Sequence, residues 1–174
     1  MPPTRITVFY ANVPQSERLV AAVSGALDSE EQSRALAFRF SKHRQEFIVA
    51  HALLRHALWS ATGIKHWRFR RQPLGKPEIV LSPGIPNVRF SLSHTGRLAA
   101  CAVCADYEVG IDVEEVKPDF DVVEAAAAAC FTPHDLAQLA PQTGRARVEA
   151  FFRLWTLKEA IDAEGNGSRA LGRT

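Results

Sequence analysis

The sequence predicts an α+β fold, and three observations support this class. The middle of the chain contains short segments in which apolar and polar residues alternate, as in half-buried strands. Longer segments with helical periodicity precede and follow these strands. Hydrophobic residues make up 47% and charged residues 23% of the 174 residues, which is typical of a folded globule with room for one medium domain or two small halves.

The N-terminal part begins with a strand and continues as helix. The segment "ITVFYANV" (6–13) is rich in β-branched and aromatic residues and predicts a strand. Residues 16–40 have helical periodicity that is broken near "LDSEE". There, Ser29 stands three residues before Gln32, which is the spacing of a capping box at the start of a second helix.

The segment "HRQEFIVAHALLRHALWSATG" (43–63) predicts the clearest helix of the chain. Its apolar residues form one continuous stripe at helical spacing, and Gly63 follows as a plausible C-cap. The stripe consists of Phe47, Ala50, Leu54, Ala57 and Leu58.

Short strands and turns are predicted in the middle of the chain. "HWRFRRQ" alternates, and "PLGKPEIVLSPGIPN" is dense in proline and glycine, so we expect a loop with one short strand. Residues 88–95, 98–105 and 108–116 then read as three consecutive strands joined by the short connections "GR" and "DY". Such short connections predict an antiparallel meander.

The last third of the sequence predicts helices. "VVEAAAAAC" is an alanine-rich helix, and "TPHDLAQLA" opens with Thr132 as cap and Pro133 in the first turn. "RARVEAFFRLWTLKEAIDAEG" predicts a long helix with an apolar side.

Composition and charge exclude several classes of protein. The net charge is +2, from 21 basic and 19 acidic residues, which argues against nucleic-acid binding but leaves room for a small anionic ligand. No run of 18 apolar residues and no signal peptide is found, so we expect a cytoplasmic protein that does not span a membrane.

The odd count of three cysteines fits a reducing compartment. Cys101 and Cys104 have C-x-x-C spacing within an apolar run, and we expect buried strand thiols rather than a metal or redox pair.

Two carboxylates in "VGIDVEEV" raise a chemical question. On a strand, Gly110, Asp112 and Glu114 would share one face, with successive members about 6.6 Å apart. Two neighbouring carboxylates repel each other unless a positive charge lies between them, and Mg²⁺ prefers about two carboxylates together with phosphate oxygens. For this pattern alone, a solvated strand face is the ordinary explanation.

Three further segments carry polar residues that suit an anionic ligand. Ser93, His94 and Thr95 end a strand before Gly96, and Lys76 stands in a loop between glycine and proline. Lys158 and Glu159 follow an apolar helical stretch. Taken singly, each has an ordinary explanation, namely a structural histidine, a solvated turn and a surface ion pair.

Taken in order, the motifs resemble those of a known family. They are G-K-P, F-S-L-S-H-T-G, G-I-D-V-E and W-T-L-K-E-A, and they resemble the 4′-phosphopantetheinyl transferases, in particular the larger pseudo-dimeric class that activates surfactin synthetase. "FRFSKHRQEFIVAHALLR" and "CFTPHDLAQL" are also similar to segments of that family. The resemblance runs from about Ser29 to Gly167.

This resemblance implies a fold of two similar α+β halves, each a small antiparallel sheet packed on a long helix, with coenzyme A between them. The halves would be residues 1–105 and 106–174, the second one incomplete. The reaction would transfer phosphopantetheine to a serine of an acyl or peptidyl carrier protein and release adenosine 3′,5′-bisphosphate. The implied magnesium ligands are Asp112, Glu114 and Glu159, and the implied catalytic residues are Asp112, Lys158 and Glu159. The implied coenzyme A contacts are Arg44, Lys76, Pro77, Ser93, His94 and Thr95.

The sequence departs from the family pattern at three places. "KEAIDAEGNG" is one residue shorter than the family motif and has Asp162 where a lysine is expected. In the early helix, Glu46 takes the place of an arginine that reaches the 3′-phosphate, with Arg44 as the nearest substitute and Lys42 and Arg39 in reserve. The ending "SRALGRT" has no strand pattern, so we expect an incomplete second half-sheet.

Two alternatives to the transferase stay open, and the departures favour the first of them. The first is an impaired relative that binds coenzyme A or a partner without turnover. The second is a magnesium-dependent phosphohydrolase, although no Walker loop or dinucleotide fingerprint supports it. The resemblance implies a monomer, because both halves of the site lie in one chain, while a dimer through the incomplete second half is the alternative. The carrier protein and the acceptance of acylated coenzyme A stay open.

Overall fold

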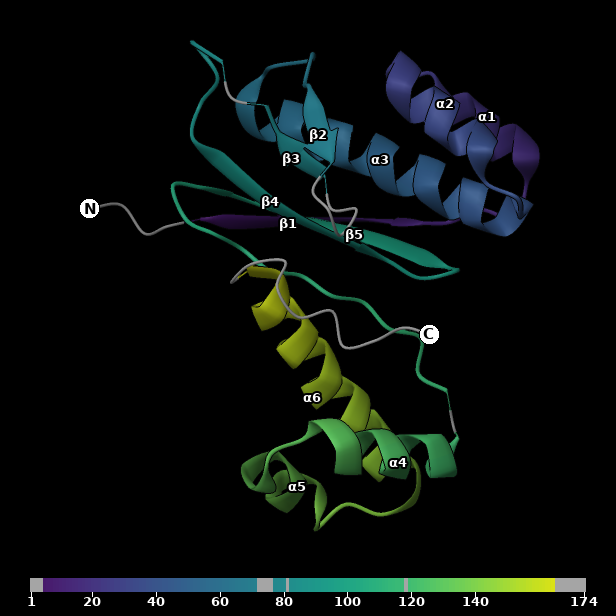
Figure 1. The fold of residues 1–174 in the computed structure, drawn as a ribbon, viewed down its shortest axis with the longest axis vertical. Helices are drawn as coiled ribbons and strands as arrows, with labels where there is room; N and C mark the ends of the chain where they lie inside the picture. Colours follow the sequence, from purple (N-terminus) through teal and green to yellow (C-terminus); the bar gives the residue numbers. More distant parts are fainter. Residues whose placement is uncertain (1–4, 72–76, 81, 118, 165–174) are drawn as a thin grey trace.

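The protein is described by a computed structural model, which covers residues 5–71, 77–80, 82–117 and 119–164. Its centre is a three-stranded antiparallel sheet in the order β1-β5-β4 (Figure 1). The strands are β1 (Ile6–Asn12), β4 (Val88–His94) and β5 (Leu98–Ala105). In the central strand β5, six consecutive residues are buried, because both faces of the sheet are covered there.

Three helices cover one face of the sheet. The long helix α3 (Ser41–Thr62) packs against β5, and α1 (Glu17–Ser24) and α2 (Ser29–Ala37) pack on α3 (Figure 1). Leu54, Ala57 and Leu58 of the predicted apolar stripe are completely buried. Gly63 ends α3 with φ 74°, and its N–H donates to the carbonyl of Trp59, which confirms the predicted C-cap.

The cap of α2 lies one residue earlier than predicted. Asp28, not Ser29, is the N-cap, because its carboxylate accepts from the N–H of Glu31 while the Glu31 side chain accepts from the N–H of Asp28. The same type of motif was expected, but a neighbouring residue supplies it.

A small two-stranded antiparallel sheet lies after α3. It consists of β2 (Phe69–Arg71) and β3 (Pro77–Ile79), which confirms the predicted short strands. Lys76 belongs to a segment outside the described residues, and Pro77 is the first residue of β3.

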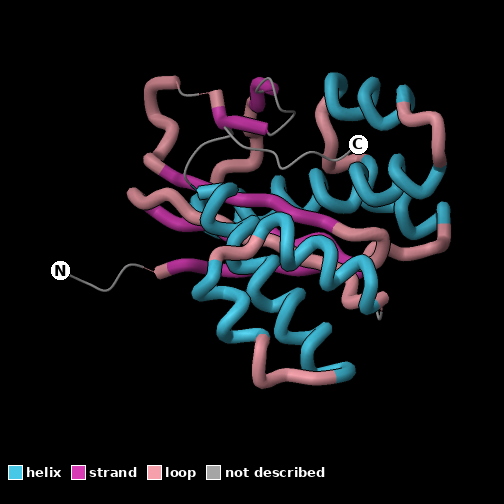
Figure 2. The backbone as a smooth tube through the Cα atoms, turned by 60° about the horizontal axis from the view of Figure 1, so that its bottom comes forward, coloured by secondary structure: helices cyan, strands magenta, loops and turns pink. Residues whose placement is uncertain are grey.

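The C-terminal helices form a second core on the other side of the sheet. They are α4 (Phe120–Cys130), α5 (Pro133–Leu139) and α6 (Gly144–Glu164). Figures 1 and 2 show helices on both sides of the strands, with α4–α6 opposite α1–α3. The core between α4, α5 and α6 contains Val123, Ala127, Phe131, Leu139, Val148 and Phe151.

The α+β class is confirmed, and the small antiparallel sheets with their helices agree with the implied transferase fold, but one strand prediction is wrong. Residues 108–117 form no strand, although 88–95 and 98–105 do pair as the predicted antiparallel hairpin. A strand can pair with one neighbour on each side, and β5 already pairs with β4 and with β1 from the start of the chain. The predicted third strand of the meander therefore has no free side of β5 with which to pair. Within the described part of residues 106–174 there are three helices and no strand.

Residues 106–115, here called the strap, instead run alongside β4 in the same direction. Polar contacts join Asn87 to Asp106, Arg89 to Glu108, Ser93 to Asp112 and Arg97 to Glu115. The residue numbers of the two partners rise together from pair to pair, so the strap runs parallel to β4. The strap is therefore held mainly by side chains, where the predicted strand would have used a backbone ladder.

The two strand cysteines are buried free thiols, as predicted. Cys101 belongs to the core under α3, whereas Cys104 packs with Val109 of the strap. Residues three apart on a strand face opposite sides of the sheet, so the C-x-x-C spacing does not bring the two sulfurs together. Burial raises the pKa of the Cys101 thiol to about 12. Among the described residues, no helix is sufficiently long and apolar to cross a membrane.

Candidate active site

Asp112 is the best-defined acidic residue of the candidate site. The Ser93 hydroxyl donates to Asp112 Oδ1 at 2.7 Å and accepts from the N–H of Val113 at 3.3 Å. The other carboxylate oxygen, Asp112 Oδ2, is buried and has no hydrogen-bond partner among the described residues. A buried unpaired carboxylate oxygen is costly, so this position suits a bound cation.

The strap is pressed directly against α6 at Gly110. A Cβ atom at this position would stand 1.8 Å from the carbonyl oxygen of Ala160. On the sheet side, Val109 and the partly buried Ile111 pack against Ala102 and Cys104. The strap therefore lies between the sheet and the helix, and its contact on α6 is the residue that follows Glu159.

The three predicted magnesium ligands are not gathered into one metal-binding group in this structure. Among the described residues, no set of three histidine, cysteine, aspartate or glutamate side chains is placed to hold a metal ion. The fit to a cation therefore rests on Asp112 Oδ2. Glu114 and Glu159 both make interactions of their own within the chain.

Strand alternation separates the predicted coenzyme A contacts at the end of β4. Ser93 faces the strap, whereas His94 faces α3, where its Nδ1 lies 3.7 Å from Glu46 Oε2. The hydroxyl of Thr95 accepts from the N–H groups of Arg97 and Leu98 at 3.3 Å each and so shapes the turn.

Lys42 lies at the same turn as His94. Lys42 Cε stands 2.8 Å and Lys42 Nζ 3.0 Å from where a Cβ of Gly96 would be, and Glu46 Oε1 is 3.5 Å from that point. Lys42, Glu46 and His94 thus form a polar cluster beside the β4–β5 turn. Lys42 is therefore the basic residue at the start of α3 whose contact with Gly96 places it at the β4–β5 turn, where β4 ends with His94.

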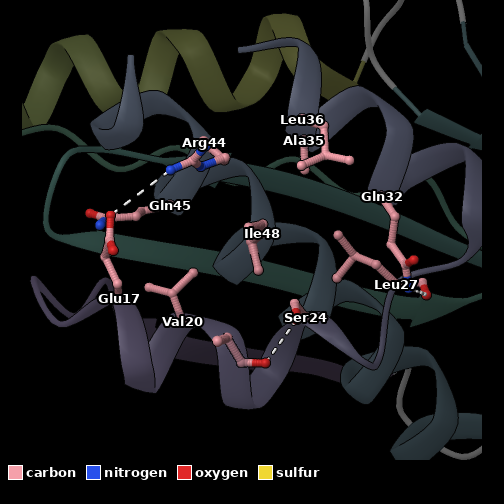
Figure 3. Close-up of a pocket in the computed structure, with 11 residues that line it drawn as sticks. Glu17, Val20, Ser24, Leu27, Gln32, Ala35, Leu36, Arg44, Gln45 and Ile48 are labelled. Atoms are coloured by element: carbon pink, nitrogen blue, oxygen red, sulfur yellow. Dashed lines mark hydrogen bonds and ion pairs between the residues drawn. The ribbon is translucent and has the colours of Figure 1, made fainter. Parts of the chain in front are cut away.

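Arg44 points to a different part of the molecule. Its guanidinium lies 3.9 Å from the carboxylate of Glu17, and it lines a pocket of about 390 Å³ between α1, α2 and α3 (Figure 3). Positions 42 and 44 are separated by about 200° around a helix, which explains why the two side chains diverge.

Lys158 forms an ion pair that sequence reasoning did not anticipate. Its Nζ lies 2.8 Å from Asp135 Oδ2, and the same carboxylate accepts from the N–H and hydroxyl of Thr132 in the cap of α5. Hydrogen bonding from Lys158, and then from Thr132, lowers the pKa of Asp135 to about 2. The predicted cap motif "TPHD" was the signal that Asp135 is fixed, although it did not reveal the partner.

Lys158 and Glu159 also line a small pocket of about 230 Å³. Its wall includes the ring of Phe131, whose centroid is 5.8 Å from Lys158 Nζ, and it also includes Asp162. Asp162, which stands where the family pattern has a lysine, is therefore near the predicted catalytic pair.

The sequence patterns did not predict a buried polar network that lies between α2 and α3. Glu31 accepts from Arg55 Nε at 2.6 Å and lies 2.8 Å from His51 Nδ1, while Arg55 also pairs with Asp28 and donates to the Trp67 carbonyl at 3.2 Å. Burial alone would raise the pKa of Glu31, but the hydrogen bonds from His51 and Arg55 outweigh it and hold that pKa below its usual value. The network fastens α2 to α3, away from the strap.

Comparison with known proteins agrees with this fold. Residues 13–106 match the family model for the N-terminal part of 4′-phosphopantetheinyl transferases, and residues 108–161 match the model for the 4′-phosphopantetheinyl transferase superfamily. The fold and these two matches thus define an α+β protein of the phosphopantetheinyl transferase class. The chain belongs to the 4′-phosphopantetheinyl transferase superfamily.

Curated relatives of the larger class are similar over most of this chain. The 4′-phosphopantetheinyl transferase HetI of Nostoc sp. is 33% identical over 88% of this chain and 65% of its own length. A 4′-phosphopantetheinyl transferase of Bacillus subtilis is 31% identical, and Sfp of Bacillus subtilis strain 168 is 28% identical, with the same two coverages. The chain therefore spans about 65% of the length of these relatives.

Among solved structures, a holo-(acyl-carrier-protein) synthase from Bacillus anthracis in complex with CoA is similar, with a TM-score of 0.48 and 19% identity. That comparison covers 57% of this chain and 92% of the synthase.

Proposed function

We propose that this chain transfers the 4′-phosphopantetheine group from coenzyme A to a serine of an acyl or peptidyl carrier protein, with Mg²⁺. The observation that carries the proposal is Asp112, whose buried Oδ2 lacks a partner among the described residues while Ser93 fixes its other oxygen. Membership in the superfamily and the transferase relatives support the same reaction.

In the proposed site, Asp112 would hold Mg²⁺ together with Glu114 and Glu159. When bound, the ion would neutralise charge on the diphosphate of coenzyme A. Its remaining ligand positions would be taken by water and phosphate oxygens, as Mg²⁺ commonly requires. The two glutamates belong to the strap and to α6, which meet at Gly110 and Ala160.

The chain's own residues would place and neutralise the phosphates. His94 and Thr95 would border coenzyme A at the β4–β5 turn, and Ser93 stands beside them. Lys76 and Pro77 would border the nucleotide, and Lys42 at the β4–β5 turn would be the further basic contact in place of Arg44, which lies beside Glu17. Lys158 would bring positive charge to the diphosphate, in exchange for its present partner Asp135. Transfer of a phosphoryl group depends mainly on such positioning and charge compensation.

The bond changes of the proposed reaction are simple. The serine oxygen of the carrier attacks the β-phosphorus, and the bond from that phosphorus to the leaving phosphate oxygen breaks. Adenosine 3′,5′-bisphosphate departs. Glu159 would accept the serine proton through an intervening water.

A second candidate is a relative that binds coenzyme A without turnover. Three observations favour it: the described residues contain no ready three-carboxylate metal group, Lys158 is already paired, and Asp162 adds negative charge to the same pocket.

One experiment separates the two functions. The protein is incubated with Mg²⁺, coenzyme A and an apo carrier protein, and the carrier is weighed by mass spectrometry. A gain of one phosphopantetheine supports transfer, and loss of that gain in Asp112→Asn and Glu159→Gln supports the assigned roles. Coenzyme A binding without a mass gain supports the second candidate, whereas release of phosphate without carrier modification indicates a phosphohydrolase.

Compartment and assembly are part of the same proposal. We propose a cytoplasmic protein, because Cys101, Cys104 and Cys130 are all free thiols and so fit a reducing environment. We also propose a monomer, since the strap and α6 of one chain already meet. Sedimentation at several concentrations tests the monomer, with a dimer as the opposing result.

A further inference from the structure

The hydroxyl of Ser93 is committed to the strap. A serine hydroxyl has a single proton to donate, and Ser93 donates it to Asp112 Oδ1 at 2.7 Å. The same oxygen accepts from the N–H of Val113 at 3.3 Å. Ser93 therefore has no proton left for a phosphate while this arrangement holds.

The hydrogen bond to Ser93 fixes the orientation of the Asp112 carboxylate. One oxygen is tied to β4, so the other is turned into a buried position where it has no partner among the described residues. The backbone on either side is also held, because Val113 is bonded to Ser93 and Gly110 is pressed against α6. Asp112 thus presents a single preoriented carboxylate oxygen, Oδ2.

We infer that Ser93 is a positioning residue for a divalent cation, which it serves by orienting Asp112, rather than a residue that contacts coenzyme A. The inference rests on the proposed function in one respect only, namely that the occupant next to Asp112 Oδ2 is a divalent cation. The role of Ser93 does not require that the protein catalyses the transfer reaction.

Loss of the Ser93 hydroxyl should loosen the orientation of Asp112. In Ser93→Ala, Asp112 Oδ1 would lose its hydrogen bond from β4, so the carboxylate could rotate away from the orientation in which Oδ2 faces the cation. Loss of a group that orients a metal ligand typically weakens metal binding by about 10- to 100-fold.

The test uses Mn²⁺ alone as the probe, with free Mn²⁺ measured by electron paramagnetic resonance. Wild-type protein should bind Mn²⁺, and Ser93→Ala should bind it about 10- to 100-fold more weakly. Ser93→Thr keeps the hydroxyl and should restore binding. Ser91→Ala is the matched control, because Ser91 lies two residues earlier on the same face of β4, where it is buried and Ser93 is partly buried. Asp112→Asn should abolish binding.

Each result decides the inference. Equal Mn²⁺ affinity in wild type and Ser93→Ala would overturn it, as would the absence of Mn²⁺ binding by the wild type. Weak binding in Ser93→Thr would show that the packing at Ser93, not its hydroxyl, matters, and would also overturn it. If Mn²⁺ binding follows the expected order while the carrier gains no mass, the proposed transfer fails but the role of Ser93 stands.

Discussion

Gly110 and Ala160 are in such close contact that a Cβ atom on Gly110 would lie 1.8 Å from the Ala160 carbonyl oxygen. This contact joins the strap, which carries Asp112, to the helix that carries Glu159. A side chain at Gly110 would have to displace helix backbone, which relaxes less readily than a flexible side chain.

We therefore predict that Gly110→Ala destabilises the protein by about 1–3 kcal/mol, the usual cost of overpacking a close contact. Urea unfolding measures the change. Gly25→Ala is the control, because nothing lies within 4 Å of a Cβ there and the backbone is already helical with φ −65°. Equal stability of Gly110→Ala and Gly25→Ala would show that α6 does not rest on the strap.

Asp135 should make stability sensitive to acid. Its pKa is lowered from 3.8 to about 2, chiefly by the hydrogen bond from Lys158. Because the folded value is the lower one, the stabilisation is complete above about pH 4 and is lost as the pH falls through about 2. Asp135→Asn should be less stable than wild type at pH 5, and the difference should shrink toward pH 2.

Unfolding midpoints between pH 2 and 6 measure this effect. The control is Glu149→Gln, which removes an exposed i,i+4 pair with Arg145 and should change stability little. A constant difference between Asp135→Asn and wild type across this range would contradict the ion pair with Lys158.

The network around Glu31 should be essential for stability. Glu31 is 3% exposed, and within the described part of the chain its removal leaves the buried cation of Arg55 with only Asp28 as an acidic partner. Breaking one side of a buried ion pair commonly costs about 3–5 kcal/mol, so Glu31→Gln should lose roughly 3 kcal/mol. Denaturant unfolding checks this, with the exposed neighbour Glu30→Gln as control. Similar stabilities of the two variants would contradict a structural role for the network.

Lys42 rather than Arg44 should affect binding of coenzyme A. Lys42 lies at the β4–β5 turn beside His94, whereas Arg44 is near Glu17 in the pocket between α1, α2 and α3. Loss of one charge-assisted contact costs about 1.5–3 kcal/mol, so Lys42→Met should weaken binding by roughly tenfold or more. Arg44→Met should leave the affinity nearly unchanged.

Calorimetric titration with coenzyme A at several salt concentrations measures both variants. The salt dependence should be smaller in Lys42→Met, because a phosphate contact is lost. A larger loss of affinity in Arg44→Met would restore Arg44 as the phosphate contact.

Local sequence patterns predicted the regular elements because the forces that decide them act between near neighbours. The apolar stripe of α3, its end at Gly63 and the cap of α5 at Thr132 depend on residues within a few positions of each other. Burial of Cys101 and Cys104 followed from an unbroken apolar run. The family motifs also marked Asp112, Lys158 and Glu159 before any contact was known.

Tertiary structure alone decided which segments and charges meet. The alternation in residues 109–116 is compatible with a strand, but β1 already fills the edge of β5, and that pairing joins residues almost a hundred positions apart. The pairing of Lys158 with Asp135, the divergence of Lys42 and Arg44, and the bond from Ser93 to Asp112 likewise depend on packing between distant elements. A single sequence encodes periodicity along the chain, whereas the competition for sheet edges and counter-charges is settled only when all elements are packed together.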